Sequence, residues 1–508
     1  MAKKILALFL LFGTPFLAPW KGEENHSNSL KKNVIFMVMD GTNADVITLA
    51  RHYKGAPLAL DSILTGGVKT YSSQSAITDS AAAASAMATG HKTLKDYIGM
   101  VPYQAADGKN RGRPVANIME AAKAKGLATG IVATSPVQHA TPAAFSSHTM
   151  SRHNMHEIGK QQAHQNIDIL LGGGKRYSSV NEGRDVQIVR TKSELDKAKG
   201  KSLHGYFAEE EMAYDMDRKK LKPEQPSLAD MTKKALGMLS SHPKGFFLFI
   251  EGSKVDYAGH KNDPVGMISE ALAFDAAVEE ALAFAKKHPN TLLIAVADHG
   301  NSGLTMGNKQ TDQTYAETPA EMFVNPLKKA SLTVTGAVSL LKKDRSNLEE
   351  VLHLYGLDGL EQRKIRKIRE SRDIEKELVS LMAERAHLGF TTRGHSGEDV
   401  FLYSFGPKKP AGLINNTDLP TKVAAHLELD SLSELTNKLF IPAKDYYEKR
   451  GYETENNIKR DSDAVFVAKK GKTVIEYPAN ENKRKVNGRE ETLPGIVVFN
   501  GDTFWIPK

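Results

Sequence analysis

Continuous apolar runs, rather than alternating ones, recur along the chain. Runs with almost no polar residue suit strands that are buried on both faces, as in parallel sheets. Stretches with helical character separate them, at 44–53, 114–125 and 269–287. Strands that alternate with helices indicate the α/β class, and we expect a doubly wound, mostly parallel central sheet with helices on both faces. The strand candidates are 34–39, 128–134, 167–171, 245–250, 291–297 and 400–405.

Two regions differ from this pattern. Residues 326–388 contain charge-rich helical stretches, typical of solvated helices, and we expect a surface insertion that lies over a functional site or at a subunit contact. After a main domain of 21–430, residues 431–508 begin with helical stretches broken at Pro442 and continue with short β-like runs. Turn residues separate these runs, which predicts hairpins in a small C-terminal β appendage. Attachment to a surface or to a neighbouring subunit is a hypothesis for its role.

The first twenty residues have the pattern of a secretory signal. Lys3 and Lys4 precede a short apolar run, too short to span a membrane. We therefore predict a signal peptide at 1–20 and a secreted or periplasmic, cell-envelope location. The cleavage site is poor, so a retained anchor is the alternative. The chain has no cysteine, so any metal must be held by histidine, carboxylate and hydroxyl groups.

Composition is that of an ordinary globular protein. The chain has 508 residues, of which 25% are charged and 40% hydrophobic, with a formal net charge of +8. Because lysine and arginine are interleaved with aspartate and glutamate, this charge indicates mild attraction for phosphorylated substrates or anionic surfaces. A nucleic-acid-binding module would show a concentrated basic stripe, and we expect no specific nucleic-acid binding.

Residues 75–91 contain the first candidate for chemistry. Ser80 follows Thr78 and Asp79 and begins a long alanine-rich run, which favours a helix. The start of a helix attracts anions and stabilises an alkoxide, so Ser80 is a candidate nucleophile beside a phosphate site. The alternative is that Asp79 and Ser80 only cap the helix.

Acidic residues and histidines recur at the ends of the predicted strands. A single one is more often a hydrogen-bonding loop residue, but recurrence in four separate segments suffices for more than one metal ion. Asp256 and His260 are four residues apart, which on a helix places both on one face. Mixed histidine and carboxylate ligands suit zinc, and oxygen ligands suit magnesium. The candidates are Asp40, Glu251, Asp256, His260, Asp298, His299 and His395.

Six segments together resemble the alkaline phosphatase family. Their order and spacing match over roughly residues 33–407, with interruptions, so the resemblance implies a metal-dependent phosphomonoesterase. The segments are 38–41, 78–82, 139–144 continuing to Arg152, 251–260, 297–299 and 394–399.

The resemblance implies a role for each site residue. Ser80 would be the nucleophile that becomes phosphorylated, and Arg152 would clamp two phosphate oxygens. Two successive displacements would retain the configuration at phosphorus. One zinc ion would be held by Asp256, His260 and His395. A second would be held by Asp40, Asp298 and His299, with Ser80 beside it as a further ligand. A third ion, usually magnesium, would be held by Asp40, Thr141 and Glu251.

Two positions depart from the best-known bacterial pattern of this family. His139 and Tyr257 stand where that pattern has aspartate and lysine. His139 can ligate the third ion itself, which makes zinc or cobalt an alternative to magnesium. Tyr257 cannot supply a positive charge, so we expect weaker binding of inorganic phosphate.

Three functions therefore remain open at this point. The expected one is hydrolysis of phosphate monoesters; the sequence does not decide the oligomeric state, for which a homodimer is one hypothesis. A phosphodiesterase or related hydrolase of the same superfamily is the first alternative, because the metal framework is shared. A non-catalytic phosphate-binding envelope protein is the second, although retention of Ser80 argues against it.

Overall fold

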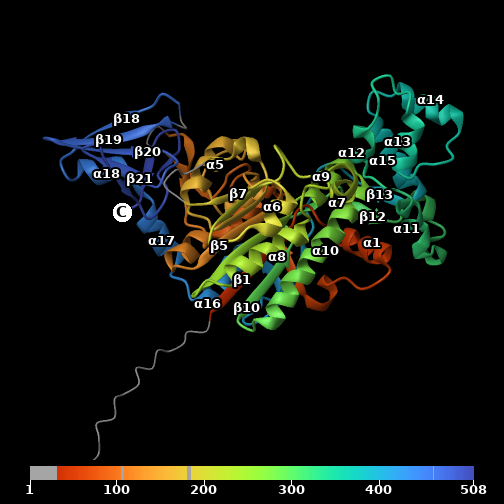
Figure 1. The fold of residues 1–508 in the computed structure, drawn as a ribbon, viewed down its shortest axis with the longest axis horizontal. Coiled ribbons are helices and arrows are strands. Elements are labelled where there is room, and N and C mark those ends of the chain that lie inside the picture. The colour runs from red at the N-terminus through yellow and green to blue at the C-terminus, as the bar shows by residue number, and fades with distance from the viewer. Residues whose placement is uncertain (1–30, 105–107, 180–184, 461–462) are drawn as a thin grey trace, which may run out of the picture. The chain divides into compact units, whose positions relative to one another are not determined.

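A ten-stranded sheet forms the centre of the computed structural model of this protein, which describes residues 31–104, 108–179, 185–460 and 463–508 (Figure 1). The predicted signal peptide at 1–20 lies outside the described residues. No helix within the described ranges is long and apolar enough to cross a membrane. In sheet order the strands are β16 (Gly412–Asn415), β2 (Leu64–Lys69), β15 (Val400–Phe405), β10 (Thr291–Val296), β1 (Lys32–Met39), β9 (Gly245–Gly252), β5 (Ala128–Pro136), β6 (Ile169–Gly173), β8 (Leu203–Tyr206) and β7 (Gln187–Val189).

The sheet is mostly parallel. All neighbours from β10 to β7 pair in parallel, whereas β15 is antiparallel to both β10 and β2, and β16 is parallel to β2. Only β15 among these ten strands therefore runs in the opposite direction.

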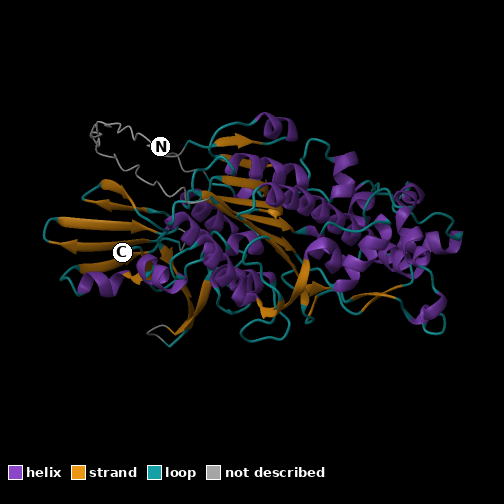
Figure 2. Ribbon diagram, turned by 90° about the horizontal axis from the view of Figure 1, so that it is seen from below, coloured by secondary structure: helices purple, strands orange, loops and turns teal. Residues whose placement is uncertain are grey.

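Both faces of the sheet are covered by helices (Figure 2). In β1, Ile35 and Met37 belong to one apolar core, and Val34 and Phe36 belong to the other. This burial on both sides explains why the strands are continuously apolar, and it confirms the predicted doubly wound α/β class. The first core contains residues of α1 (Ala44–Lys54), α8 (Leu228–Leu239) and α10 (Pro264–Lys287), and the second contains residues of α2 (Ser80–Thr89), α3 (Ile118–Ala124), α4 (Ala140–Ala144) and α16 (Leu419–Leu427).

Two predicted helices begin at other residues in the structure than the sequence pattern predicted. The stretch 114–125 becomes helical only at Ile118, because Pro114 ends β4 (Asn110–Pro114) and Asn117 forms a capping box with Glu120. The stretch 269–287 begins earlier, at Pro264, since Asp263 caps the helix. Local capping therefore decides where both helices begin, and the periodicity of apolar residues alone does not predict these first residues.

The region predicted as an insertion is helical. Its apolar residues, such as Leu348 and Leu378, belong to the first core, so these helices pack on the α/β body instead of standing apart from it. The predicted bounds of the insertion remain a prediction. The helices, green to teal in Figure 1, are α11 (Ala320–Lys328), α12 (Val334–Ser339), α13 (Leu348–Leu354), α14 (Gln362–Glu370) and α15 (Ile374–Arg385).

The C-terminal region forms two small sheets. β19 and β20 are the predicted hairpin, but the run 495–506 splits into two strands that pair with each other and with β17. Three further strands, β18, β21 and β22, lie in polar sequence that gave no strand signal. The elements are α17 (Leu432–Leu439), β17 (Ile441–Pro442), α18 (Ala443–Glu448), β18 (Glu453–Asn457), β19 (Val465–Lys470), β20 (Thr473–Pro478), β21 (Lys483–Val486), β22 (Arg489–Thr492), β23 (Val498–Phe499) and β24 (Phe504–Ile506).

Candidate functional site

Three neighbouring strands bring acidic residues to one edge of the sheet. Asp40 directly follows β1, which lies between β9 and β10. In the β1–β9 register Val38 pairs with Glu251, and β10 is followed closely by Asp298 and His299. The carboxyl ends of parallel strands meet at this edge, which explains how residues far apart in sequence come together.

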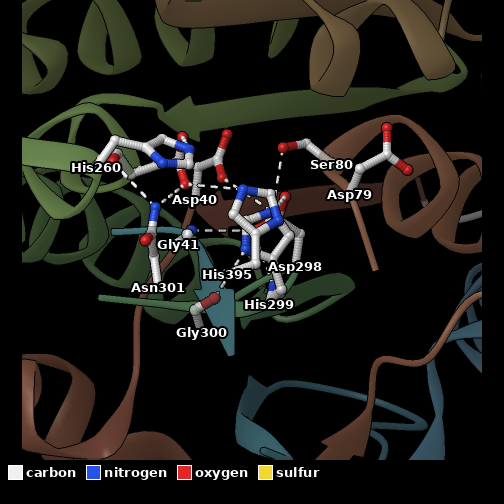
Figure 3. A network of polar contacts seen from close by, with 12 residues as sticks. Asp40, Gly41, Asp79, Ser80, His260, Asp298, His299, Gly300, Asn301 and His395 are labelled. Carbon is white, nitrogen blue, oxygen red and sulfur yellow. Dashed lines mark hydrogen bonds and ion pairs between the residues drawn. The ribbon is translucent and has the colours of Figure 1, made fainter. Parts of the chain in front are cut away.

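Two shorter elements complete the arrangement. α9 (Lys254–Lys261) follows β9 and presents Asp256 and His260 one turn apart. His395 lies in β14 (His395–Ser396), which pairs with β11 (Gly300–Asn301) beside His299. Figure 3 shows the side chains of His260, His299 and His395 gathered around Asp40.

The side chains form three groups suited to metal binding. Within each group the potential ligand atoms lie within 4.8 Å of one another. Asp40 belongs to two groups, and His299 also belongs to two, so the sites share residues. The groups are Asp256 with His299 and His395; Asp40 with Asp298 and His299; and Asp40 with His139 and Glu251.

His260, expected as a ligand, lies just outside the first group. Its Nε2 is 3.4 Å from Asp256 Oδ2 and its Nδ1 is 2.8 Å from the Arg393 carbonyl oxygen. His395 is oriented in the same way, with Nδ1 2.8 Å from the Thr78 carbonyl oxygen and Nε2 3.5 Å from Asp256 Oδ1. Backbone contact at one ring nitrogen leaves the other facing the carboxylate, as in metal-binding histidines.

Unpartnered buried atoms support a fit to cations. Asp40 Oδ1 and Glu251 Oε1 are buried without a hydrogen bond. Burial raises the pKa of Asp40 well above its usual value, with repulsion from Asp298 as the next cause, and burial raises the pKa of Glu251 to about 7. Buried, mutually repelling carboxylates are unfavourable unless cations balance them. The donor set therefore fits divalent metal ions.

Gly41 lets Asp40 and α9 approach closely. Its φ is +68°, and a Cβ there would lie 2.7 Å from the backbone and side chain of Asp256. Its N–H donates to Asp298 Oδ1 at 3.0 Å. Any larger residue at this position would both strain the turn and separate the ligands.

Ser80 is the first residue of α2 and is 1% exposed. Asp79 caps the helix by accepting from the Ala82 N–H at 3.1 Å. Ser80 Oγ lies 3.1 Å from His299 Nε2, at the edge of the second metal group (Figure 3). Asp79 is therefore the helix cap, and Ser80 is the adjacent residue, whose role as a nucleophile stays a prediction.

Arg152 faces the same cavity as Ser80, which has a volume of about 340 Å³. Its Nη1 lies 3.4 Å from Asp79 Oδ2 and its Nη2 lies 3.1 Å from His139 Nε2. Burial, followed by the charge of Arg152, lowers the pKa of His139 to about 3. In the metal-free protein His139 is therefore a neutral acceptor that helps to hold the guanidinium group.

Thr141 and Tyr257 also lie at the site. Thr141 Oγ1 donates to Asp40 Oδ2 at 3.4 Å, which places it beside the third group. The ring of Tyr257 lies 5.8 Å from that of His139, and burial raises the pKa of its phenol well above the usual value. Tyr257 is thus a neutral wall of the cavity.

Three supporting residues have roles that the sequence did not show. Asp79 was expected only as a cap, but it also accepts a hydrogen bond from Arg152. Ser135 donates to Glu251 Oε2 at 3.1 Å, and Asn301 donates to Asp256 Oδ1 at 2.6 Å. Ser135 lies near the end of β5 in the main sheet, and Asn301 lies in the short strand β11, so only the tertiary arrangement of these strands could have identified them.

Comparisons with known proteins agree with this geometry. Residues 31–429 match the family model described as alkaline phosphatase. The chain is 35% identical to alkaline phosphatase 3 of Bacillus subtilis (strain 168), over 78% of this chain and 89% of that protein. It is similar to the crystal structure of Thermus thermophilus alkaline phosphatase, with a TM-score of 0.70 and 26% identity, over 82% of this chain and 96% of that chain.

A second similar structure contains a metal. It is a variant of the alkaline phosphatase from the Antarctic bacterium TAB5 in which a histidine is replaced by glutamate, with magnesium bound in its M3 site. This chain is similar to it with a TM-score of 0.56 and 25% identity, over 79% of this chain and 100% of that chain.

Proposed function

The chain belongs to the alkaline phosphatase family, and from this we propose that it hydrolyses phosphate monoesters to an alcohol and inorganic phosphate through a phosphoserine. Its predicted resemblance to that family is confirmed. The observation that carries the proposal is the position of Ser80 Oγ, which lies beside His299 in a cavity that also contains Arg152.

Three metal ions are part of this proposal. When bound, they would lower the pKa of the Ser80 hydroxyl and of water and would balance the charge of the phosphoryl group. We expect two zinc ions and a third ion that is magnesium, or zinc or cobalt if His139 ligates it. For the first zinc the proposed ligands are Asp256, His260 and His395, with His299 nearby. For the second zinc they are Asp40, Asp298 and His299. For the third ion they are Asp40, Thr141 and Glu251, with His139.

The residues of the chain divide the reaction into two displacements. Ser80 Oγ loses its proton and attacks phosphorus, so an O–P bond to serine forms. The ester P–O bond breaks, and the leaving alcohol oxygen gains a proton in place of the one lost by Ser80. Water then loses a proton and attacks the phosphoserine, the bond to Ser80 breaks, Ser80 Oγ regains a proton, and inorganic phosphate leaves. The planar fork of Arg152 would bind two phosphoryl oxygens in both steps, which lysine could not do equally.

The first test is a comparison of chromogenic substrates. The metal-reconstituted protein should hydrolyse a phosphate monoester faster than the corresponding diester. Preference for the diester would favour the phosphodiesterase alternative, and stoichiometric phosphate binding without turnover would favour the binding protein. Secretion into the envelope and a homodimeric state also remain proposals, testable by cell fractionation and by light scattering.

The third metal should depend on His139. We predict that His139→Asp shifts the third site from zinc or cobalt toward magnesium, because a carboxylate oxygen suits magnesium better than an imidazole does. Elemental analysis after equilibration with mixed zinc and magnesium would measure the ratio. Tyr257→Phe, which alters the neighbouring ring without adding a ligand, is the control. An unchanged ratio in His139→Asp would show that His139 is no ligand.

Product release should depend on Tyr257. We predict that Tyr257→Lys binds inorganic phosphate about 3- to 10-fold more tightly, because an ammonium group in the cavity adds a charge-assisted hydrogen bond. The inhibition constant of phosphate is the measurement. Tyr257→Phe removes the hydroxyl without adding charge and should leave inhibition near that of the natural protein. Equal inhibition in all three proteins would contradict the prediction.

A further inference from the structure

A second, larger cavity continues from the one that contains Ser80. Its volume is about 890 Å³, against about 340 Å³ for the inner cavity, and both fall in the range of ligand pockets. Glu211, Tyr214 and Thr335 line both cavities, so these residues form their junction. A monoester whose phosphoryl group lies at Ser80 would extend its alcohol part past this junction.

The segment that carries Glu211 is held firmly by its backbone. It follows β8, and the Glu210 carbonyl oxygen accepts from the Gly174 N–H at 2.8 Å. On the other side of Glu211, the Met212 N–H donates to the Thr134 carbonyl oxygen at 3.0 Å. The neighbouring strand ends therefore fix the position of the acidic run Glu209–Glu211 at the cavity wall.

Of the three carboxylates in this run, only Glu211 is left without a partner. Glu209 forms an ion pair with Lys175, and Glu210 forms one with Arg176. Glu211 is exposed and makes no hydrogen bond or ion pair with any residue in the described ranges. It is thus a free negative charge at the passage between the two cavities.

Two lysines close to the junction are already engaged. Lys261 donates to Thr335 Oγ1 at 2.8 Å and pairs with Glu375 at 2.9 Å. Lys254 is 3% exposed and donates to the Met212 carbonyl oxygen at 2.6 Å, with its ammonium 4.0 Å from the centre of the Tyr214 ring. Neither forms an ion pair or a hydrogen bond with Glu211, so the junction retains room for a positive group.

We infer that Glu211 selects phosphate monoesters whose alcohol part carries an ammonium group a few bonds from the ester oxygen. The phosphoryl group would occupy the inner cavity, the ammonium would lie at Glu211, and the remainder would extend into the outer cavity. This inference rests on the proposed function, and it concerns preference among monoesters. An exposed ion pair is modest in strength, so the expected discrimination is several-fold.

Three monoesters of equal length test the inference: 2-aminoethyl, 2-hydroxyethyl and carboxymethyl phosphate. In the natural protein kcat/KM should fall in that order, from cationic through neutral to anionic. Glu211→Gln should lower the ratio of the first to the second by about 3- to 5-fold, and Glu211→Lys should reverse it. The ratio should also fall with added salt, because the charge of Glu211 is screened.

Glu210→Gln is the matched control, since Arg176 already pairs with Glu210. It should leave the ratio unchanged. Hydrolysis of all three esters with a ratio that Glu211→Gln does not alter would overturn the inference while leaving the proposed function intact. Failure to hydrolyse any of them, together with the chromogenic monoester, would instead contradict the proposed function.

Discussion

Replacing Ser80 by alanine should lower kcat for a chromogenic phosphate monoester by about 10³- to 10⁵-fold. Ser80 Oγ lies at the start of α2, 3.1 Å from His299 Nε2, in the cavity shared with Arg152. Without the hydroxyl no phosphoserine can form, and the helix start and the arginine retain only their ability to bind phosphate. Steady-state kinetics with saturating metal measures the loss.

The Ser80→Ala protein must retain its site for this result to be informative. Its metal content and its affinity for inorganic phosphate should stay within a few-fold of the natural protein, since alanine keeps the helix and removes no proposed histidine or carboxylate ligand. Acid quenching during turnover should trap label from a radioactive substrate in the natural protein only. Turnover that persists in Ser80→Ala but is abolished by a chelator would exclude the phosphoserine and favour direct attack by water.

The strand ends were predictable because each combines two local signals, a continuous apolar run and an acidic residue at its end. The runs that lead to Asp40 and to Glu251 are apolar at every position, as expected for strands that are buried on both faces. Placing these carboxylates together then follows from parallel strand order. Ser80 was predictable for a similar reason, since a polar cap before an alanine-rich run marks a helix start.

The resemblance implied that Asp40 would be shared between two sites, but the place of His299 in two groups was not predictable in the same way. His299 groups with Asp256 and His395, where His260 was expected, because the short β11–β14 pairing brings His395 beside it. That pairing joins segments separated by the whole helical insertion. No local pattern encodes it, and the resemblance supplies residue roles without distances.

The C-terminal strands illustrate a different limit. β18 and β22 are polar and largely exposed, so they have neither the alternation nor the apolar run by which a strand is recognised. They are strands because β19 and β21 offer them paired hydrogen bonds. Cross-strand pairing of this kind depends on tertiary context more than on composition.

Asp40→Asn should produce the second large effect, a loss of activity of at least about 10³-fold. Asp40 belongs to two of the three metal groups, so one substitution weakens two sites at once. Asparagine preserves the volume and one carbonyl oxygen but removes the charge. Elemental analysis should show that the variant retains fewer ions per chain after dialysis than the natural protein, whereas Ser80→Ala should not.

The same substitution should stabilise the metal-free protein. Burial and repulsion from Asp298 raise the pKa of Asp40 above its unfolded value near 3.8, so keeping a carboxyl there costs stability as pH rises above that value. At pH 7.5 and without metal, Asp40→Asn should therefore unfold at a temperature about 2 °C or more above the natural protein, and the gap should close toward pH 4. With metal present the order should reverse, because only the natural protein gains the full binding energy. If the metal-free variant unfolds at a lower temperature than the natural protein at pH 7.5, favourable contacts stabilise the Asp40 carboxylate. Repulsion among these carboxylates would then not explain why the site binds cations.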